Sequence, residues 1–287
     1  MMIFIKPSRR KKIRIHYYLI GLSFNRILLR CVSISAIAWY STPFVNFIII
    51  SRLRNETVML TTPFRLPAFA DTTSFDRTVI FYIYEIGLNY FSVCYVSTCS
   101  VVSVAVNNIC CQLAVLSYRI KQLKSNYNFH SNEIFHDFCV NHLNTIRLVK
   151  TIDNAFHLVF LNELIMITVL ISLIMYNMIL HFDDVDIVSV VSLAGYGFVM
   201  ISLIGLNCFI SQNLIDQSAE LRDAYWKCEW YNMPISCKRA LMISMIYSQI
   251  PLQLTAGKFY IYSMPNFLNI LKSSMAYVSM LRTVNDK

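Results

Sequence analysis

Five stretches of this chain are apolar over lengths that cross a lipid bilayer as an α-helix, and this feature limits the fold more than any other. They cover residues 27–50, 78–118, 156–180 and 187–211, followed by a broken stretch from Pro234 to the C-terminus. A spanning helix needs about 20 mostly apolar residues. Charged residues make up 14% of the chain, against about a quarter in a soluble domain. The sequence therefore predicts an all-α membrane bundle with five spans and without β-sheet.

The flanks of these stretches refine the prediction. Residues 13–24 are too few to span, and we expect them to form a separate interfacial or half-buried helix. The second stretch exceeds the bilayer, so its cytosolic half should protrude into water. Pro234 opens a short helix that ends near Gln249, residues 251–258 interrupt it, and the last helix begins at Phe259. The predicted organisation is a basic cytosolic N-terminal segment (1–26), a transmembrane bundle with cytosolic helical extensions (27–250) and a broken last span (251–287).

The distribution of basic residues predicts the orientation of these spans. Most of the 25 Lys and Arg residues lie before the first span, in residues 119–150 and in residues 222–239. The opposite side has only Arg52, Arg54, Arg65 and Arg77. Because cytosolic loops carry the excess of Lys and Arg, we expect a cytosolic N-terminus and an extracellular C-terminus. Asn55, in an Asn-x-Thr sequon, then lies outside. This pattern also explains the net charge of +9 better than a nucleic-acid surface does.

Residues with catalytic or metal-binding chemistry form no recognisable motif. Most of the nine cysteines lie in apolar stretches without a CxxC pair, so we interpret them as small hydrophobic residues. His130, His136 and His142 are six residues apart, which does not place them on one helix face, and a solvated cytosolic segment is the favoured interpretation. No nucleophile triad or phosphate loop is evident. We predict no enzymatic activity, no cofactor and no metal.

The C-terminal third carries a specific ordered set of motifs. These are Ser218-Ala-Glu, Ala224-Tyr-Trp-Lys-Cys-Glu-Trp, Lys238-Arg-Ala-Leu-Met-Ile, Pro251-Leu-Gln-Leu-Thr-Ala-Gly-Lys-Phe-Tyr and Lys272-Ser-Ser-Met-Ala-Tyr-Val-Ser-Met-Leu-Arg-Thr-Val-Asn. Together they resemble the insect odorant receptor family, strongly from about Leu193 onward and more weakly from Ile27. Family members have seven spans and a cytosolic N-terminus. The resemblance therefore implies that the five stretches match the third to seventh spans and that the first two are missing.

The same resemblance implies a function and partners. It implies a subunit of an odorant-gated cation channel in the plasma membrane, assembled with a shared co-receptor as a hetero-tetramer and activated by a small volatile organic ligand. The last helix of each subunit would line the pore. On that helix Ser273, Tyr277, Met280 and Val284 recur at helical spacing beside Thr283. The resemblance places these residues at the pore, whereas the pattern alone is typical of ordinary helix packing.

Aromatic and acidic residues within the spans are the remaining candidates. Five aromatic residues can line an apolar odorant cavity: Trp39, Tyr82, Tyr90, Tyr196 and Phe198. Lipid-facing or core aromatics are the alternative in a chain with 17 Tyr and 19 Phe residues. Glu85 and Glu163 are ionisable residues in apolar spans, where they are costly and often functional. Neither has a partner that the sequence identifies, and both can be explained as reaching the membrane interface.

Three other functions were weighed against the channel. A metabotropic chemoreceptor needs the opposite orientation and usually an Asn-Pro-x-x-Tyr run near its last span, which is absent here. A secondary transporter should show internal repeats with broken helices in both halves, but only the last span is broken. A non-functional or regulatory receptor fragment is the third alternative, because two spans of the family are unmatched.

Overall fold

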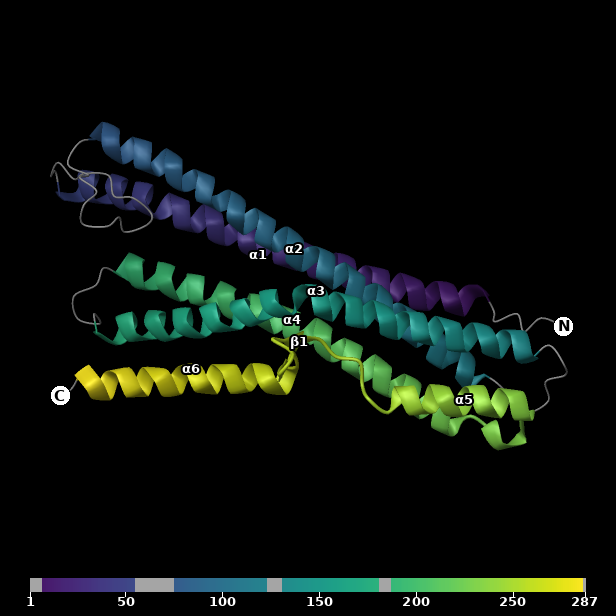
Figure 1. Cartoon of the computed structure of the whole chain (residues 1–287). Coiled ribbons are helices and arrows are strands. Elements are labelled where there is room, and N and C mark those ends of the chain that lie inside the picture. Colours follow the sequence, from purple (N-terminus) through teal and green to yellow (C-terminus); the bar gives the residue numbers. More distant parts are fainter. Residues whose placement is uncertain (1–6, 55–74, 123–130, 181–186, 286–287) are drawn as a thin grey trace. The chain divides into compact units, whose positions relative to one another are not determined.

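The computed structural model describes residues 7–54, 75–122, 131–180 and 187–285, and these ranges are almost entirely helical (Figure 1). The helices are α1 (Pro7–Arg54), α2 (Phe75–Lys121), α3 (Ser131–Leu180), α4 (Ile187–Lys227), α5 (Ile235–Ser248) and α6 (Met264–Asn285), with a 3-10 turn η1 (Trp230–Asn232) before α5. Two short strands, β1 (Thr255–Ala256) and β2 (Tyr260–Ile261), lie between α5 and α6. The predicted helical membrane fold is confirmed.

Four of the helices are much longer than a bilayer is thick. α1, α2, α3 and α4 contain 48, 47, 50 and 41 residues. At a rise of 1.5 Å per residue each is roughly 60–75 Å long, whereas the hydrocarbon core of a bilayer is about 30 Å thick. The second helix therefore has the excess length that the sequence predicted, and the other three have it too.

Residues 13–24 do not form a separate interfacial helix, because they are the first third of the continuous helix α1. A close contact with α2 explains this correction. The amide of Asn107 donates a hydrogen bond of 2.7 Å to the carbonyl oxygen of Tyr17. A Cβ at Gly21 would stand only 2.8 Å from Nδ2 of the same Asn107. The absence of a side chain at Gly21 thus lets α2 approach α1 at this turn, where Gly21 and Phe24 are buried.

Within the described residues, four segments are long and apolar enough to cross a membrane. They are Lys11–Ile37 in α1, Val93–Lys121 in α2, Asp137–Met175 in α3 and Gly197–Lys227 in α4. α6, the predicted fifth span, has 22 residues, which is also long enough. Several of its side chains, Tyr277 and Val284 among them, are not described. The fifth span therefore remains a prediction.

The chain divides into two compact units. The first combines Met1–Phe24, Val101–Thr168 and Ile204–Ser273, and the second combines Asn25–Ser100, Val169–Leu203 and Ser274–Lys287. In the first unit, buried residues of α2 recur at helical spacing, for example Val106, Leu113 and Ile120. Leu214 and Leu221 on α4 are buried at the same seven-residue interval. These stripes form the core of the first unit.

His142 belongs to that core, so the prediction that it is solvated is wrong. Its side chain is buried on α3, with Nδ1 3.3 Å from the hydroxyl of the buried Tyr225 on α4. The two rings also pack against each other, with centroids 5.6 Å apart. Histidine is moderately polar, and a single hydrogen-bond partner makes its burial acceptable. His130 lies outside the described residues, and the side chain of His136 is likewise not described.

The expectation of a chain without β-sheet is corrected by β1 and β2, which pair in antiparallel fashion. Thr255 lies opposite Ile261, and Ala256 lies opposite Tyr260. The backbone of an interrupted helix loses its internal hydrogen bonds, and the two-residue ladder replaces part of them. The turn between the strands has two left-handed residues, Gly257 with φ 62° and Lys258 with φ 66°. This pairing is confined to the break in the last span.

α6 begins at Met264 and not at Phe259 as predicted, because the residues from 259 to 263 have other partners. Tyr260 belongs to β2, and its hydroxyl donates to the carbonyl oxygen of Asn266 at 2.8 Å. The Asn266 amide in turn donates to the carbonyl oxygen of Ile261 at 2.7 Å. Ser263 accepts a 3.4 Å hydrogen bond from the backbone N–H of Asn266, as a helix N-cap does. The hairpin and Ser263 therefore stabilise the first turn of α6 through hydrogen bonds with Asn266.

Candidate functional site

The linker between α5 and α6 is fastened to α3 by a carboxylate. Oδ1 of Asp153 accepts hydrogen bonds from the backbone N–H of Thr255 at 2.7 Å and from its hydroxyl at 2.8 Å. One helical turn further along α3, the carbonyl oxygen of His157 accepts from the N–H of Gly257 at 2.9 Å. Hydrogen bonds to a charged acceptor are about twice as strong as neutral ones. The hairpin is therefore held against one turn of α3, with Thr255 at Asp153 and Gly257 at His157.

Gly257 makes this close approach possible. A Cβ at this position would stand 2.9 Å from Cδ2 of Leu161 on α3 and 2.6 Å from the ring of Phe259. The residue also has φ 62°, a conformation that costs other L-residues about 1 kcal/mol or more. Both the turn and its contact with α3 therefore require glycine.

A second fastening involves Glu163, which is buried on α3 with 7% of its surface exposed. Its Oε1 accepts a hydrogen bond of 3.0 Å from the amide of Asn207 on α4. The hydroxyl of Tyr262, just before α6, lies 3.4 Å from Oε2 and 3.3 Å from the carbonyl oxygen of Phe160. The interpretation that Glu163 merely reaches the membrane interface is therefore wrong. Its carboxylate joins α3, α4 and the linker.

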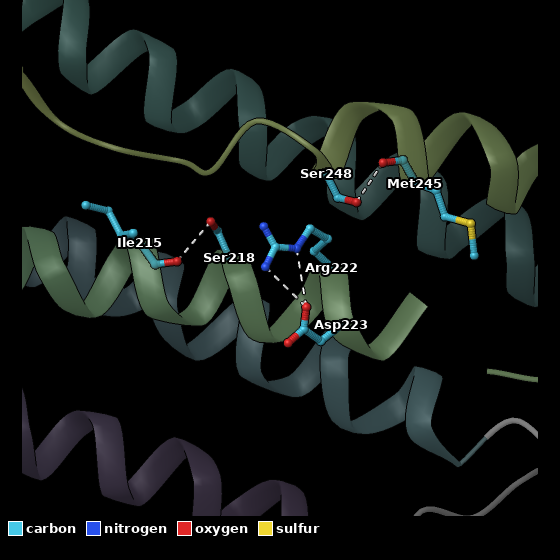
Figure 2. Close-up of polar contacts among 6 residues, drawn as sticks. All are labelled: Ile215, Ser218, Arg222, Asp223, Met245 and Ser248. Atoms are coloured by element: carbon cyan, nitrogen blue, oxygen red, sulfur yellow. Dashed lines mark hydrogen bonds and ion pairs between the residues drawn. The ribbon is translucent and has the colours of Figure 1, made fainter. Parts of the chain in front are cut away.

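At the other end of the linker, Ser218 of α4 (Figure 2) contacts Leu252. The hydroxyl of Ser218 accepts from the backbone N–H of Leu252 at 3.0 Å and donates to the carbonyl oxygen of Ile215 at 3.1 Å. Figure 2 shows Arg222 one turn along, with its guanidinium 3.3 Å from the carboxylate of the adjacent Asp223. That ion pair is partly exposed and contributes little. Ser218 therefore matters more than the charged pair for the path of the linker.

The exposed side of α6 contains the described residues of the predicted pore face. Ser273, Met280 and Thr283 are exposed, whereas Ile270 and Ser274 are buried. The hydroxyls of Ser273 and Thr283 donate to carbonyl oxygens within their own helix, both at 2.9 Å. The side chains of Tyr277 and Val284 are not described. The role of this face in a pore remains a prediction.

The predicted odorant cavity is also untested. Tyr90 on α2 and Phe198 on α4 are 71% and 70% exposed. The side chains of Trp39, Tyr82, Tyr196 and Glu85 lie outside the described part of the structure. All five aromatic residues fall in the second compact unit.

The sequence contained a signal for the linker site that composition does not reveal. Asp153, His157, Phe160 and Glu163 follow one another on α3 at intervals of four, three and three residues, which is one helix face. A face with two carboxylates in an apolar helix predicts a polar partner. The partner could not be named, because Thr255 and Tyr262 are about 100 residues further along the chain.

Known proteins share sequence similarity with this chain. A family model described as 7tm Odorant receptor matches residues 5–275. An odorant receptor coreceptor from Aedes aegypti is 23% identical over 142 residues, which are 49% of this chain and 29% of the coreceptor. Odorant receptor 13a from Drosophila melanogaster is 24% identical over 232 residues, or 74% of this chain and 54% of that receptor. The chain thus spans about a third to a half of these relatives.

The fold has a counterpart among solved structures. The insect olfactory receptor OR5 from Machilis hrabei, in complex with eugenol, superimposes with a TM-score of 0.82 at 14% sequence identity. The match covers 99% of this chain and 71% of the OR5 chain. A second structure of the same receptor superimposes with a TM-score of 0.74. At this level of identity the likeness establishes the fold.

The hydrogen bond between Thr255 and Asp153 makes a first prediction. Thr255→Val keeps the shape of the side chain but leaves the carboxylate with one donor fewer, so the free energy of unfolding should fall by about 1 kcal/mol. Denaturant unfolding of the full chain in micelles measures this change. Thr151→Val is the matched control, because the Thr151 hydroxyl donates only to Arg147 within α3. Equal losses in the two variants would contradict the assignment.

Proposed function

The chain belongs to the 7tm Odorant receptor family, and on this premise we propose that it is a subunit of an odorant-gated cation channel in olfactory signalling. This is a family of multi-pass membrane receptors and not of enzymes. The proposal assigns the three roles of such a subunit to different parts of the chain. α6 lines the pore, the second compact unit receives the odorant, and the linker between α5 and α6 holds the base of the pore helix.

The observation that carries the proposal is the construction of α6. The helix is separated from α5 by the hairpin and attached at its base through Asn266, Tyr262 and Ser263. Beyond this base, Met280 and Thr283 present an exposed mixed face. A helix fixed at one end and uncovered at the other suits a pore wall that adjoins the same helix of other subunits. Apolar residues in such a wall can gate by excluding water, and polar ones can contact ions.

Assembly with a shared co-receptor as a hetero-tetramer is the second part of the proposal. The coreceptor of Aedes aegypti is itself a relative of this chain, so the two subunits can contribute corresponding surfaces. α5 supports the idea, because Ile243 and Ile246 are exposed on it and the exposed Ile250 follows just after its end. Isoleucines at this spacing form an apolar stripe outside the long spans. A neighbouring subunit is the proposed cover.

The ligand is proposed to be a small volatile organic molecule, the class to which the eugenol in the OR5 complex belongs. Trp39, Tyr82, Tyr90, Tyr196 and Phe198 remain the proposed lining residues. Aromatic side chains supply apolar surface, and tyrosine hydroxyls supply the few polar contacts typical of small-molecule sites. Odorant binding opens the channel only if it favours the open arrangement over the closed one.

The proposed location is the plasma membrane, with the N-terminus in the cytosol and the C-terminus outside. The distribution of Lys and Arg supports this orientation. It places the linker and α5 on the cytosolic side and the end of α6 near the outer surface. Odorants would then reach the second compact unit from outside or through the lipid.

If α6 lines the pore, a polar substitution in its constriction should let current flow in the absence of odorant. Met280→Ser and Val284→Ser place a hydroxyl in the proposed constriction, so water should occupy it without ligand and resting current should rise roughly severalfold. Whole-cell recording of the full chain with its co-receptor, before and during odorant application, measures this. Thr283→Ala should change ion selectivity at the same position.

Met275→Ser is the matched control for these variants, because Met275 is exposed on the opposite side of α6. It should leave both resting current and selectivity unchanged. If Met280→Ser, Val284→Ser and Thr283→Ala all conduct like the original chain while expressed at the surface, α6 does not line the pore. An altered odorant preference with normal conduction would instead assign this face to the odorant site.

The orientation makes a separate prediction in cells. Glycosylation tags inserted before Arg26, within residues 123–130 or at Glu229 should remain unmodified, because these sites are proposed to be cytosolic. The native sequon at Asn55 should be glycosylated. Mobility shifts after glycosidase treatment report both results. A modified tag at any of the three sites would refute the proposed orientation.

A further inference from the structure

The less exposed side of α6 faces α4 at a glycine. In the first two turns of α6, Ile270 is buried and Phe267 is half-buried, whereas Leu268 and Asn269 are exposed. The ring of Phe267 lies opposite Gly205 of α4, where a Cβ would stand 3.4 Å from Cζ and 3.8 and 3.9 Å from Cε1 and Cε2. The space between the two helices at this level therefore admits a single carbon atom but not a branched side chain.

The base of α6 is attached differently to α3 and to α4. On the α3 side, Asp153 accepts hydrogen bonds of 2.7 and 2.8 Å from the backbone N–H and the hydroxyl of Thr255 in the linker. On the α4 side, the N–H of Met264 lies 3.4 Å from Oε1 of Gln212, which is long for a hydrogen bond. The base of α6 is thus held on α3 through the linker by strong polar contacts, and it meets α4 largely through apolar packing.

α4 is one continuous helix from Ile187 to Lys227. It carries two of the proposed odorant-lining residues, Tyr196 and Phe198, and Gly205 follows Phe198 by two helical turns. A displacement of α4 at its odorant-lining turns would therefore also displace Gly205. Packed helices can slide past each other by small amounts, and an apolar contact at a glycine allows this without the loss of a hydrogen bond.

We propose that Gly205 and Phe267 form a sliding contact through which α4 moves the base of α6. The inference rests on the proposed channel function, and it makes Gly205 a positioning residue for the pore helix. Because Gly205 has no side chain, the ring of Phe267 can stay close to α4 while the two helices shift. A branched side chain at this position would fill the space and push the base of α6 away from α4.

Amide hydrogen exchange of the full chain in micelles tests the position of α6. Gly205→Val should make the amides of Leu268 and Asn269 exchange about tenfold faster or more, because valine is stiff in a helix and its methyl groups overlap the facing ring. The amide of Gly257 should keep its rate, since it bonds to His157 of α3. Gly205→Ala should change these rates little, because one carbon meets the ring at an ordinary contact distance.

Gly195→Val is the matched control on the same helix, because no atom of another described segment lies within 4 Å of a Cβ at this position. It should leave the exchange of α6 unchanged. Phe267→Ala added to Gly205→Val should return the Leu268 amide toward its original rate, since the missing ring makes room for valine. Equal acceleration by Gly195→Val, faster exchange at Gly257, or additive effects in the double variant would overturn the contact.

Whole-cell recording of the full chain with its co-receptor tests transmission through the contact. The probes are eugenol and a panel of volatile alcohols and esters, and a compound that activates the original chain is titrated. Gly205→Val should shift its half-activating concentration about tenfold or more at equal surface expression, and added Phe267→Ala should reverse the shift. An unchanged concentration despite altered exchange would refute transmission. A silent original chain would count against the proposed channel, and the exchange rates would then decide the positioning role of Gly205.

Discussion

The buried carboxylate of Glu163 is the group on which the arrangement of the last helix depends. Removing a carboxylate from water is costly unless hydrogen bonds replace the lost hydration. Here the replacements come from Asn207 on α4 and from Tyr262 just before α6. One acidic side chain thereby holds three segments that are distant in the sequence. Leaving this carboxylate unpaired costs free energy, so the contact among α3, α4 and the linker resists small displacements.

The hairpin adds a second constraint of a different kind. Asp153 and the carbonyl oxygen of His157 hold its tip, and Gly257 satisfies a steric requirement that no other residue meets without strain. Together the two fastenings define where α6 starts, while the described side chains of α6 from Lys272 onward are exposed, except that of Ser274. In the proposed channel, α6 would therefore pivot at the linker and not at α5.

How much of this could be predicted differs between the elements. Long apolar runs determine a membrane helix locally, so the helical class and the excess length of α2 followed from the sequence. The break was located because Pro251 and Gly257 are local signals. The start of α6 was placed five residues early, because the hairpin and the contacts of Asn266 compete with helix formation. Periodicity alone could not reveal that competition.

The errors on single residues have a common physical origin. Glu163 and His142 were interpreted from their neighbours in sequence, whereas their partners are 44 and 83 residues away. Such pairs become visible only when the helices are packed. The pore face and the odorant cavity depend on contacts with other subunits and with a ligand, so they remain predictions from the family resemblance.

Amide hydrogen exchange of the full chain in micelles tests most directly whether Glu163 fixes the linker. Glu163→Leu fills a similar volume without hydrogen bonds. The backbone amides of Gly257, Phe259 and Tyr262 should then exchange at least about tenfold faster, because the hairpin opens more often. The amides of α2 near the buried Leu113, in the same compact unit, should keep their protection and report that the core is intact. Unchanged exchange in the linker of a folded Glu163→Leu chain would contradict the central role of this carboxylate.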